Sequence, residues 1–222
     1  MDVIRKQPRP GHAAPNMGDL ERMRADFRWE HARAWLDGLP DGGLNIAHEA
    51  VDRHARGARR DHVAIRWVGR DGTVTDLTYA ELAARTSRFA NALAALDIGT
   101  GDVVLGLAHR LPDLYVAALG TLKHRAVFAP LFSAFGPEPI AARVAISRAR
   151  VLVTTASLYE KKIAPIRERL TTLEHVLVID DGRGSAVAGA PGLHRLDDLM
   201  AAASPHYTIG PTSPETLALL HF

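Results

Sequence analysis

Four short apolar runs recur in the second half of the chain at nearly constant spacing. They begin at Val103, Val127, Val151 and Val176, so that successive starts lie 24, 24 and 25 residues apart. Each run is too short for a helix and is continuous rather than alternating, which is typical of strands buried on both faces. A leucine-rich solenoid has a similar period, but its Leu-x-x-Leu-x-Leu signature is absent from this sequence.

Helical segments fill the intervals between these runs. The sequence predicts helices over residues 112–123, 137–147 and 158–170. Proline stands at the first position of the first two helices, where its missing N–H costs nothing, and Pro165 is expected to kink or shorten the third. Alternating strands and helices joined by short loops predict a mainly parallel, doubly wound α/β sheet with helices on both faces.

The N-terminal half is expected to add smaller elements before this layer. Residues 1–18, rich in proline and glycine, are predicted to be a flexible lead-in, and residues 19–222 to form the α/β subdomain. Thr78 and Glu81 have the spacing of a capping box, which predicts a helix start. The other predictions are helices from Asp19 to Trp35 and from Ile46 to Arg56, and a hairpin of residues 63–68 and 74–77 around Asp71-Gly72.

The C-terminal part is predicted from composition. Residues 180–192 are rich in glycine and alanine and are expected to form a loop, followed by a short helix over 196–203. The last six residues, 217–222, have the pattern of another buried strand. Because chain termini normally lie on the surface, two interpretations follow: the C-terminus is tucked into the core, or the chain is cut within a larger domain.

Composition excludes several classes of function. The 222 residues carry a formal charge of only +2, which does not indicate a nucleic-acid partner. Cysteine is absent, which excludes disulfides, cysteine nucleophiles and thiolate metal sites. No secretory signal is present, and no uncharged stretch approaches the roughly 20 residues that span a bilayer. A cytoplasmic protein without membrane partners is expected.

One loop has the composition of a ligand site. Residues 130–137, Pro-Leu-Phe-Ser-Ala-Phe-Gly-Pro, follow an apolar strand and precede a helix. This position lies at the carboxyl edge of the predicted sheet, where such folds bind ligands. Phe132 and Phe135 offer aromatic faces, and Ser133 and Ala134 are small enough to let a ligand approach the backbone. The alternative interpretation is a loop that only packs the core.

Other candidate sites are weaker. Lys161 and Lys162 follow the next strand and have the charge to meet a phosphate, although the residues alone favour a solvated helix face. His48 and Asp52 lie four residues apart, as metal ligands on a helix do, but no third ligand is identifiable and no metal site is predicted. The sequence also contains no complete phosphate-binding glycine motif and no Gly-x-Ser-x-Gly nucleophile motif.

Several stretches together resemble the N-terminal part of AMP-forming acetate–CoA ligases, members of the adenylate-forming superfamily. The resemblance covers about residues 27–222 and is strongest in the last two of the matching stretches. These stretches are residues 29–40, 43–54, 78–82, 88–91, 119–123 and 130–139.

The resemblance implies a function for the complete enzyme. Such a ligase activates acetate with ATP and Mg²⁺ as acetyl-adenylate and then passes the acetyl group to CoA. Phe132, Ser133 and Ala134 match the family loop that lies along CoA. Lys161 and Lys162 lie near the position of basic residues for the CoA phosphates, and Arg143 matches a family arginine.

The same resemblance places the catalytic parts beyond Phe222. There the family has its phosphate loop, its magnesium carboxylate, its acetate pocket and its adenylation lysine. No catalytic residue is therefore predicted in this chain, and the chain is expected to be inactive alone. Two alternatives remain open: a free-standing CoA-binding or regulatory module, and a ligase for a larger acyl acid. The oligomeric state is not predicted.

Overall fold

The computed structural model describes residue 11, residues 18–184 and residues 190–222, and its chain divides into two units between Asp37 and Gly38. The first unit contains α1 (Leu20–Asp26) and α2 (Trp29–Arg33). The flexible lead-in predicted over residues 1–18 falls outside the described residues, apart from Gly11 and Gly18. The predicted loop over 180–192 likewise falls outside them at residues 185–189.

The single helix predicted from Asp19 to Trp35 is wrong in its length. Asp19 caps α1 as expected, and its carboxylate accepts a hydrogen bond from the Arg22 backbone N–H at 3.1 Å. The chain then becomes extended at Phe27 and Arg28 before α2 begins. Neither helix contains a buried residue. Since packing of an apolar face provides most helical stability, this stretch has little to keep it in one continuous helix.

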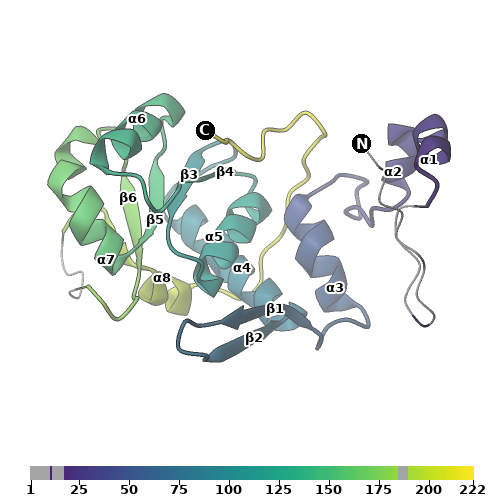
Figure 1. Cartoon of the computed structure of the whole chain (residues 1–222), viewed down its shortest axis with the longest axis horizontal. Helices are drawn as coiled ribbons and strands as arrows, with labels where there is room; N and C mark the ends of the chain where they lie inside the picture. The colour runs from purple at the N-terminus through teal and green to yellow at the C-terminus, as the bar shows by residue number, and fades with distance from the viewer. Residues whose placement is uncertain (1–10, 12–17, 185–189) are drawn as a thin grey trace, which may run out of the picture. The chain divides into compact units, whose positions relative to one another are not determined.

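The second unit, Gly38–Phe222, contains all the remaining elements (Figure 1). In chain order they are η1 (His48–Asp52), α3 (Arg53–Arg56), β1 (Val63–Val68), β2 (Val74–Thr78), α4 (Tyr79–Ala95), β3 (Val103–Leu107), α5 (Pro112–Lys123), β4 (Val127–Pro130), α6 (Pro137–Ser147), β5 (Val151–Thr155), α7 (Ala156–Leu158), η2 (Tyr159–Ile163), η3 (Ala164–Arg169), β6 (His175–Ile179), β7 (Leu193–Arg195) and α8 (Leu196–Ala202).

The smaller predicted elements are confirmed. Strands β1 and β2 pair antiparallel around Gly72, whose φ of +86° suits glycine at this turn. The Thr78 hydroxyl accepts from the Glu81 N–H, and the Glu81 carboxylate accepts from the Thr78 N–H, so the capping box opens α4. The helix predicted over residues 46–56 is present, with a wider π-type stretch, η1, in its middle.

The five-stranded sheet has the order β4-β3-β5-β6-β7, and all its pairs are parallel. From β3 the chain passes through α5 to β4, which neighbours β3 on one side. It then passes through α6 to β5, which neighbours β3 on the other side. Right-handed crossovers in opposite directions place α5 and α6 on opposite faces. The predicted doubly wound, mainly parallel sheet is therefore confirmed.

Side chains alternate between two cores along each strand. On β5, Leu152 packs with Ile140 and Ile163, whereas Val151 and Val153 pack with Phe89 of α4 and other side chains of the opposite face. Because both faces are covered, the strands need no polar positions, which explains their continuous apolar runs. Pro165 lies at the start of the 3₁₀ helix η3, where the predicted 158–170 helix changes form, as expected.

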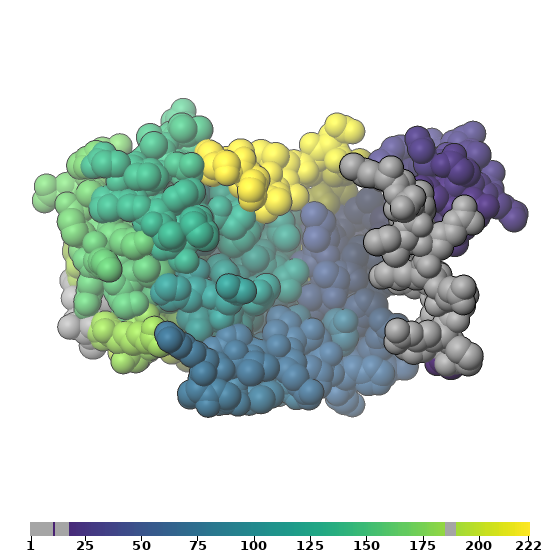
Figure 2. Space-filling model, viewed as in Figure 1, coloured from purple at the N-terminus to yellow at the C-terminus, as the bar shows by residue number. Residues whose placement is uncertain are grey.

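Two C-terminal features differ from expectation. Strand β7 was not predicted, because its three residues give no periodic signal. The strand expected over 217–222 is not buried, since Leu217 and Leu219 remain 58% and 53% exposed. This segment lies beside the edge strand β4. The Phe128 N–H donates to the Ala218 carbonyl, and the Leu220 N–H donates to the Phe128 carbonyl, each at 3.0 Å. Figure 2 shows it in yellow on the surface of the second unit.

None of the helices in the described part of the chain has the length and hydropathy needed to cross a membrane.

Candidate functional site at the carboxyl edge of the sheet

The strand order reverses between β3 and β5. Ligands of doubly wound folds bind outside the carboxyl ends of the strands, near such a reversal. The loop that follows β4 lies at this edge, where the Leu131 N–H donates to the Gly106 carbonyl of β3 at 2.8 Å. The topology therefore places the predicted loop at the edge that the fold uses for binding.

Two aromatic rings define this loop. Phe132 is 66% exposed, and its ring meets that of Phe135 edge to face with centroids 5.8 Å apart. The Phe135 N–H donates to the Phe132 carbonyl at 2.9 Å, which closes a tight turn. Ser133 is half-buried within this turn, and Ala134 is exposed. The loop does more than pack the core, because the Phe132 ring and Ala134 are exposed.

Arg143 joins the loop to the last residue of the chain. Its guanidinium carbon lies 4.3 Å from the centroid of the Phe135 ring and 5.6 Å from that of the Phe222 ring. One Nη donates to the Pro139 carbonyl at 3.0 Å, and the buried Nε has no hydrogen-bond partner. Arg143 therefore contacts both Phe135 and Phe222 through cation–π interactions, which link the loop to the end of the described chain.

The two predicted lysines have different surroundings. Lys162 turns toward the loop, where its ammonium donates to the carbonyls of Ser133 and Phe135, the latter at 2.7 Å. Burial, together with the neighbouring charge of Lys161, lowers the pKa of Lys162 below its usual value. Lys161 is exposed. The structure thus brings Lys162 together with the loop as a support and leaves Lys161 facing solvent.

Replacing Lys162 with methionine is expected to loosen this loop. The change keeps most of the aliphatic stem but removes the charged donor from two carbonyls, so we expect a loss of about 1–3 kcal/mol in the free energy of unfolding. Amide hydrogen exchange in residues 132–135 should become faster. The matched variant Lys161→Met removes the exposed ammonium of the preceding residue and should leave both measurements unchanged. Equal effects of the two variants would contradict this role for Lys162.

A polar cluster at the ends of β5 and β6 was not predicted. The Ser157 hydroxyl donates to the Asp181 carboxylate, and Thr155 Oγ1 lies 3.3 Å from Ser157 Oγ. Burial alone would raise the pKa of Asp181, but the hydrogen bonds from Ser157 and Thr155 lower it overall. The sequence did contain a signal for this cluster, because a serine and an aspartate each follow an apolar run closely. Parallel strands bring residues at such positions to the carboxyl edge of the sheet.

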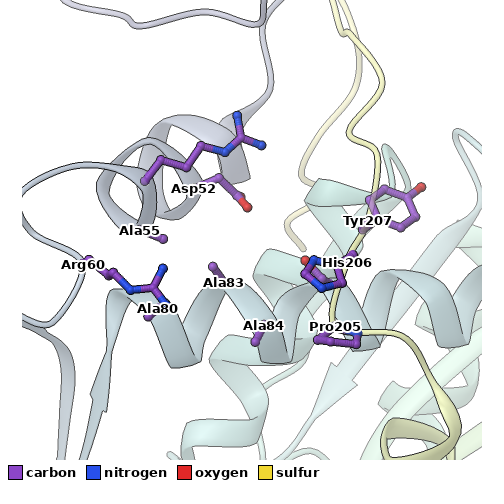
Figure 3. A pocket seen from close by; sticks show the side chains of 11 residues that line it. Asp52, Ala55, Arg60, Ala80, Ala83, Ala84, Pro205, His206 and Tyr207 are labelled. Carbon is purple, nitrogen blue, oxygen red and sulfur yellow. The ribbon is translucent and has the colours of Figure 1, made fainter.

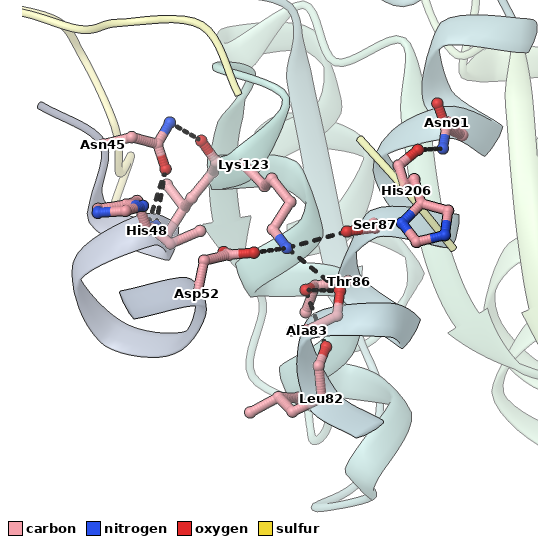
Figure 4. A network of polar contacts seen from close by, with 12 residues as sticks. Asn45, His48, Asp52, Leu82, Ala83, Thr86, Ser87, Asn91, Lys123 and His206 are labelled. Carbon is pink, nitrogen blue, oxygen red and sulfur yellow. Dashed lines mark hydrogen bonds and ion pairs between the residues drawn. The ribbon is translucent and has the colours of Figure 1, made fainter. Parts of the chain in front are cut away.

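His48 and Asp52 do not form a metal site. Asp52 Oδ1 accepts from the Lys123 ammonium at 2.9 Å, and Lys123 is completely buried (Figure 4). Lys123 also donates to the Ala83 carbonyl and the Ser87 hydroxyl, each at 3.2 Å. Within residues 18–184 and 190–222, no three His, Asp or Glu side chains lie close enough together to hold a metal ion.

Comparison with known families assigns this fold. The model of the AMP-binding enzyme family matches residues 51–222. The chain belongs to this family. Among curated members, acetyl-coenzyme A synthetase of Bacillus subtilis is 33% identical over 166 residues, which cover 74% of this chain and 28% of that protein. The enzyme of the same name from Sodalis glossinidius is 42% identical over 115 residues, 51% of this chain and 18% of that protein.

Two solved structures have a similar fold. An acyl-CoA synthetase of Brucella canis superimposes with a TM-score of 0.77 at 30% identity, over 92% of this chain and 36% of that one. The anthranilate CoA ligase AuaEII superimposes with a TM-score of 0.67 at 19% identity, over 80% of this chain and 32% of that one. This likeness shows a shared fold. This chain therefore spans well under half the length of the family members it matches.

Proposed function

We propose that the chain forms the N-terminal α/β part of an AMP-forming acetate–CoA ligase and carries part of its CoA site. The complete enzyme would convert acetate, ATP and CoA to acetyl-CoA, AMP and diphosphate. Family membership and relatives named acetyl-coenzyme A synthetase support this proposal. A cytoplasmic location belongs to the same proposal and is compatible with the absence of cysteine.

The observation that carries the proposal is the loop after β4. It combines the exposed ring of Phe132 with small neighbours at the carboxyl edge of the sheet. Phe132 gives an extended ligand an apolar surface, and Ser133 and Ala134 leave room beside the backbone. We assign CoA contacts to these three residues. Arg143 and Lys162 act mainly by holding the loop, whereas Lys161 is free to approach a CoA phosphate as a point charge.

ATP and Mg²⁺ are assigned to other parts of such an enzyme. No three His, Asp or Glu side chains among the described residues form a cluster suited to a metal ion, so these residues do not fit a magnesium site. In the proposed enzyme, magnesium binding and adenylation depend on residues other than those described in this chain. Its contribution is to bind and orient CoA.

Titration of the chain with CoA tests this assignment. We expect saturable binding by isothermal titration calorimetry, weakened about tenfold by Phe132→Ala, because an exposed aromatic contact with a ligand has an energy of about 1.4 kcal/mol. The matched variant Phe27→Ala also removes a partly exposed ring, but it lies in the first unit, outside the loop. It should leave the affinity unchanged. Binding that Phe132→Ala does not affect would reject the loop as a CoA contact.

A further inference from the structure

Two histidines on neighbouring strands lie together, outside the proposed CoA site. His175 begins β6, at the opposite end from the carboxyl edge, and His194 lies in the edge strand β7. Nδ1 of His175 is 3.1 Å from Nε2 of His194, and the ring centroids are 5.2 Å apart. Figure 3 shows a cavity of about 310 Å³ between the helix of residues 46–56, α4 and the connector that follows α8, and neither histidine lines it.

The backbone holds both histidines firmly in place. His175 is paired with β5, and His194 is paired with β6. The Val176 N–H donates to the Gly192 carbonyl at 2.7 Å, and a Cβ atom on Gly192 would lie 2.2 Å from the Glu174 carbonyl oxygen. The chain before β7 therefore approaches the start of β6 closely. Because side chains on strands are positioned more precisely than those on loops, the two half-buried rings are brought together before any ligand binds.

The distance between the two nitrogens suits a shared metal ion. Imidazole nitrogens bind Zn²⁺ at about 2.0–2.1 Å, so two nitrogens 3.1 Å apart subtend an angle of about 95–100° at one ion. This angle lies between the values of about 90° for tetragonal ions and about 109° for tetrahedral ions. Imidazole ligands suit Zn²⁺, Ni²⁺ and Cu²⁺, whereas Mg²⁺ and Ca²⁺ prefer oxygen ligands.

The protonation of the pair also allows a metal ion to bind. Burial, together with the charge of His175, lowers the pKa of His194 below its usual value, so the His194 ring is neutral at pH 7. In a neutral pair, one ring donates a hydrogen bond and the other accepts it. The donor ring can carry its proton on its other nitrogen instead, and a metal ion then takes the place of the hydrogen without net release of a proton.

These observations define the ligand. We propose that His175 and His194 together bind one divalent transition metal ion, namely Zn²⁺, Ni²⁺ or Cu²⁺. Glu174 is not a third ligand, since its two carboxylate oxygens accept from Arg150, each at 2.7 Å. Water fills the remaining coordination positions. The bound ion ties the three-residue edge strand β7 to β6.

Titration of the full chain with Zn²⁺, followed by NMR of the imidazole nitrogens, tests the proposal. We expect Nδ1 of His175 and Nε2 of His194 to shift together as one ion binds. Amide hydrogen exchange in residues 193–195 should become slower, because the ion holds β7 against β6. Mg²⁺ at the same concentration should change neither measurement. Shifts at only one of the two rings, or at neither, would overturn the proposal.

Two variants keep a polar atom at each position but remove the imidazole. His175→Asn places an amide near the position of Nδ1, and His194→Gln places one near the position of Nε2. Each should weaken Zn²⁺ binding at least about tenfold in calorimetric titrations, because one of two protein ligands is lost. The matched control His62→Asn changes an exposed histidine outside the pair and should leave the affinity within about twofold.

Both variants of the pair should fold, because an amide can still form a hydrogen bond between the strands. Circular dichroism checks this, and the NMR titration of the unchanged chain does not depend on it. Repeating the calorimetry with Ni²⁺ and Cu²⁺ identifies which of the three ions binds most tightly. Equal losses in all three variants, or no loss in either variant of the pair, would place the ion elsewhere and contradict the proposal.

Discussion

Replacing Asp52 with alanine is expected to lower the free energy of unfolding by about 3–5 kcal/mol, because it leaves a buried ammonium without its counter-charge. Lys123 is completely buried, and Asp52 is the carboxylate that pairs with it, at 2.9 Å. Burial already lowers the pKa of Lys123, and the charge of Asp52 acts in the opposite direction. Without Asp52 the lysine must lose its proton or draw water into the core. Urea unfolding followed by circular dichroism measures the loss.

The double variant Asp52→Leu with Lys123→Met separates this effect from general damage. It removes both charges together and replaces them with apolar groups of similar size, so most of the lost stability should return. Arg66→Gln, which breaks an exposed ion pair with Asp76, should change stability by less than about 1 kcal/mol. A double variant as unstable as Asp52→Ala would show that the ion pair does not control the effect.

Gly120→Val is expected to destabilise the fold by about 3 kcal/mol, since α5 approaches α4 too closely for any side chain at this position. A Cβ atom on Gly120 would lie 2.7 Å from Cδ1 and 2.8 Å from Cβ of Phe89. Phe89 is completely buried, so any shift of its ring must displace neighbouring core side chains. The same urea experiment detects the change as a lower midpoint.

Gly99→Val is the matched control for this prediction. A Cβ atom there would have only Asp102 Oδ2 near it, at 3.7 Å, which is an ordinary contact. We expect a change within about 0.5 kcal/mol. If both valine variants lost the same stability, the close packing of α4 and α5 would not be the cause.

Much of the second unit could be predicted from sequence because local and tertiary signals agree there. The helices over 112–123 and 137–147 begin at a proline and end where predicted. The capping box of Thr78 likewise depends only on residues three apart. Strands between two helical layers are mainly apolar, so the runs that begin at Val103 and Val151 were recognisable. The loop at Phe132 followed from its place between a strand and a helix.

The remaining features depend on contacts between distant residues. The apolar spacing from Asp19 to Trp35 predicted one helix, but α1 and α2 contain no buried residue. Whether such a face packs against a core depends on distant parts of the chain. The pairing of Asp52 with Lys123 joins residues 71 positions apart, and neither residue has a local signal for it. Lys162 was predicted as a phosphate ligand from its charge, whereas its hydrogen bond to the Phe135 carbonyl joins residues 27 positions apart.

Acetate-dependent AMP formation, measured with ATP and CoA, tests the proposed function most directly. The assay would compare this chain alone with a B. subtilis acetyl-coenzyme A synthetase whose matching 166-residue segment is replaced by that of this chain. We expect no turnover above background from the chain alone and measurable turnover from the exchanged enzyme. Turnover by the chain alone, or an exchanged enzyme that folds and binds ATP yet forms no acetyl-CoA, would contradict the proposal.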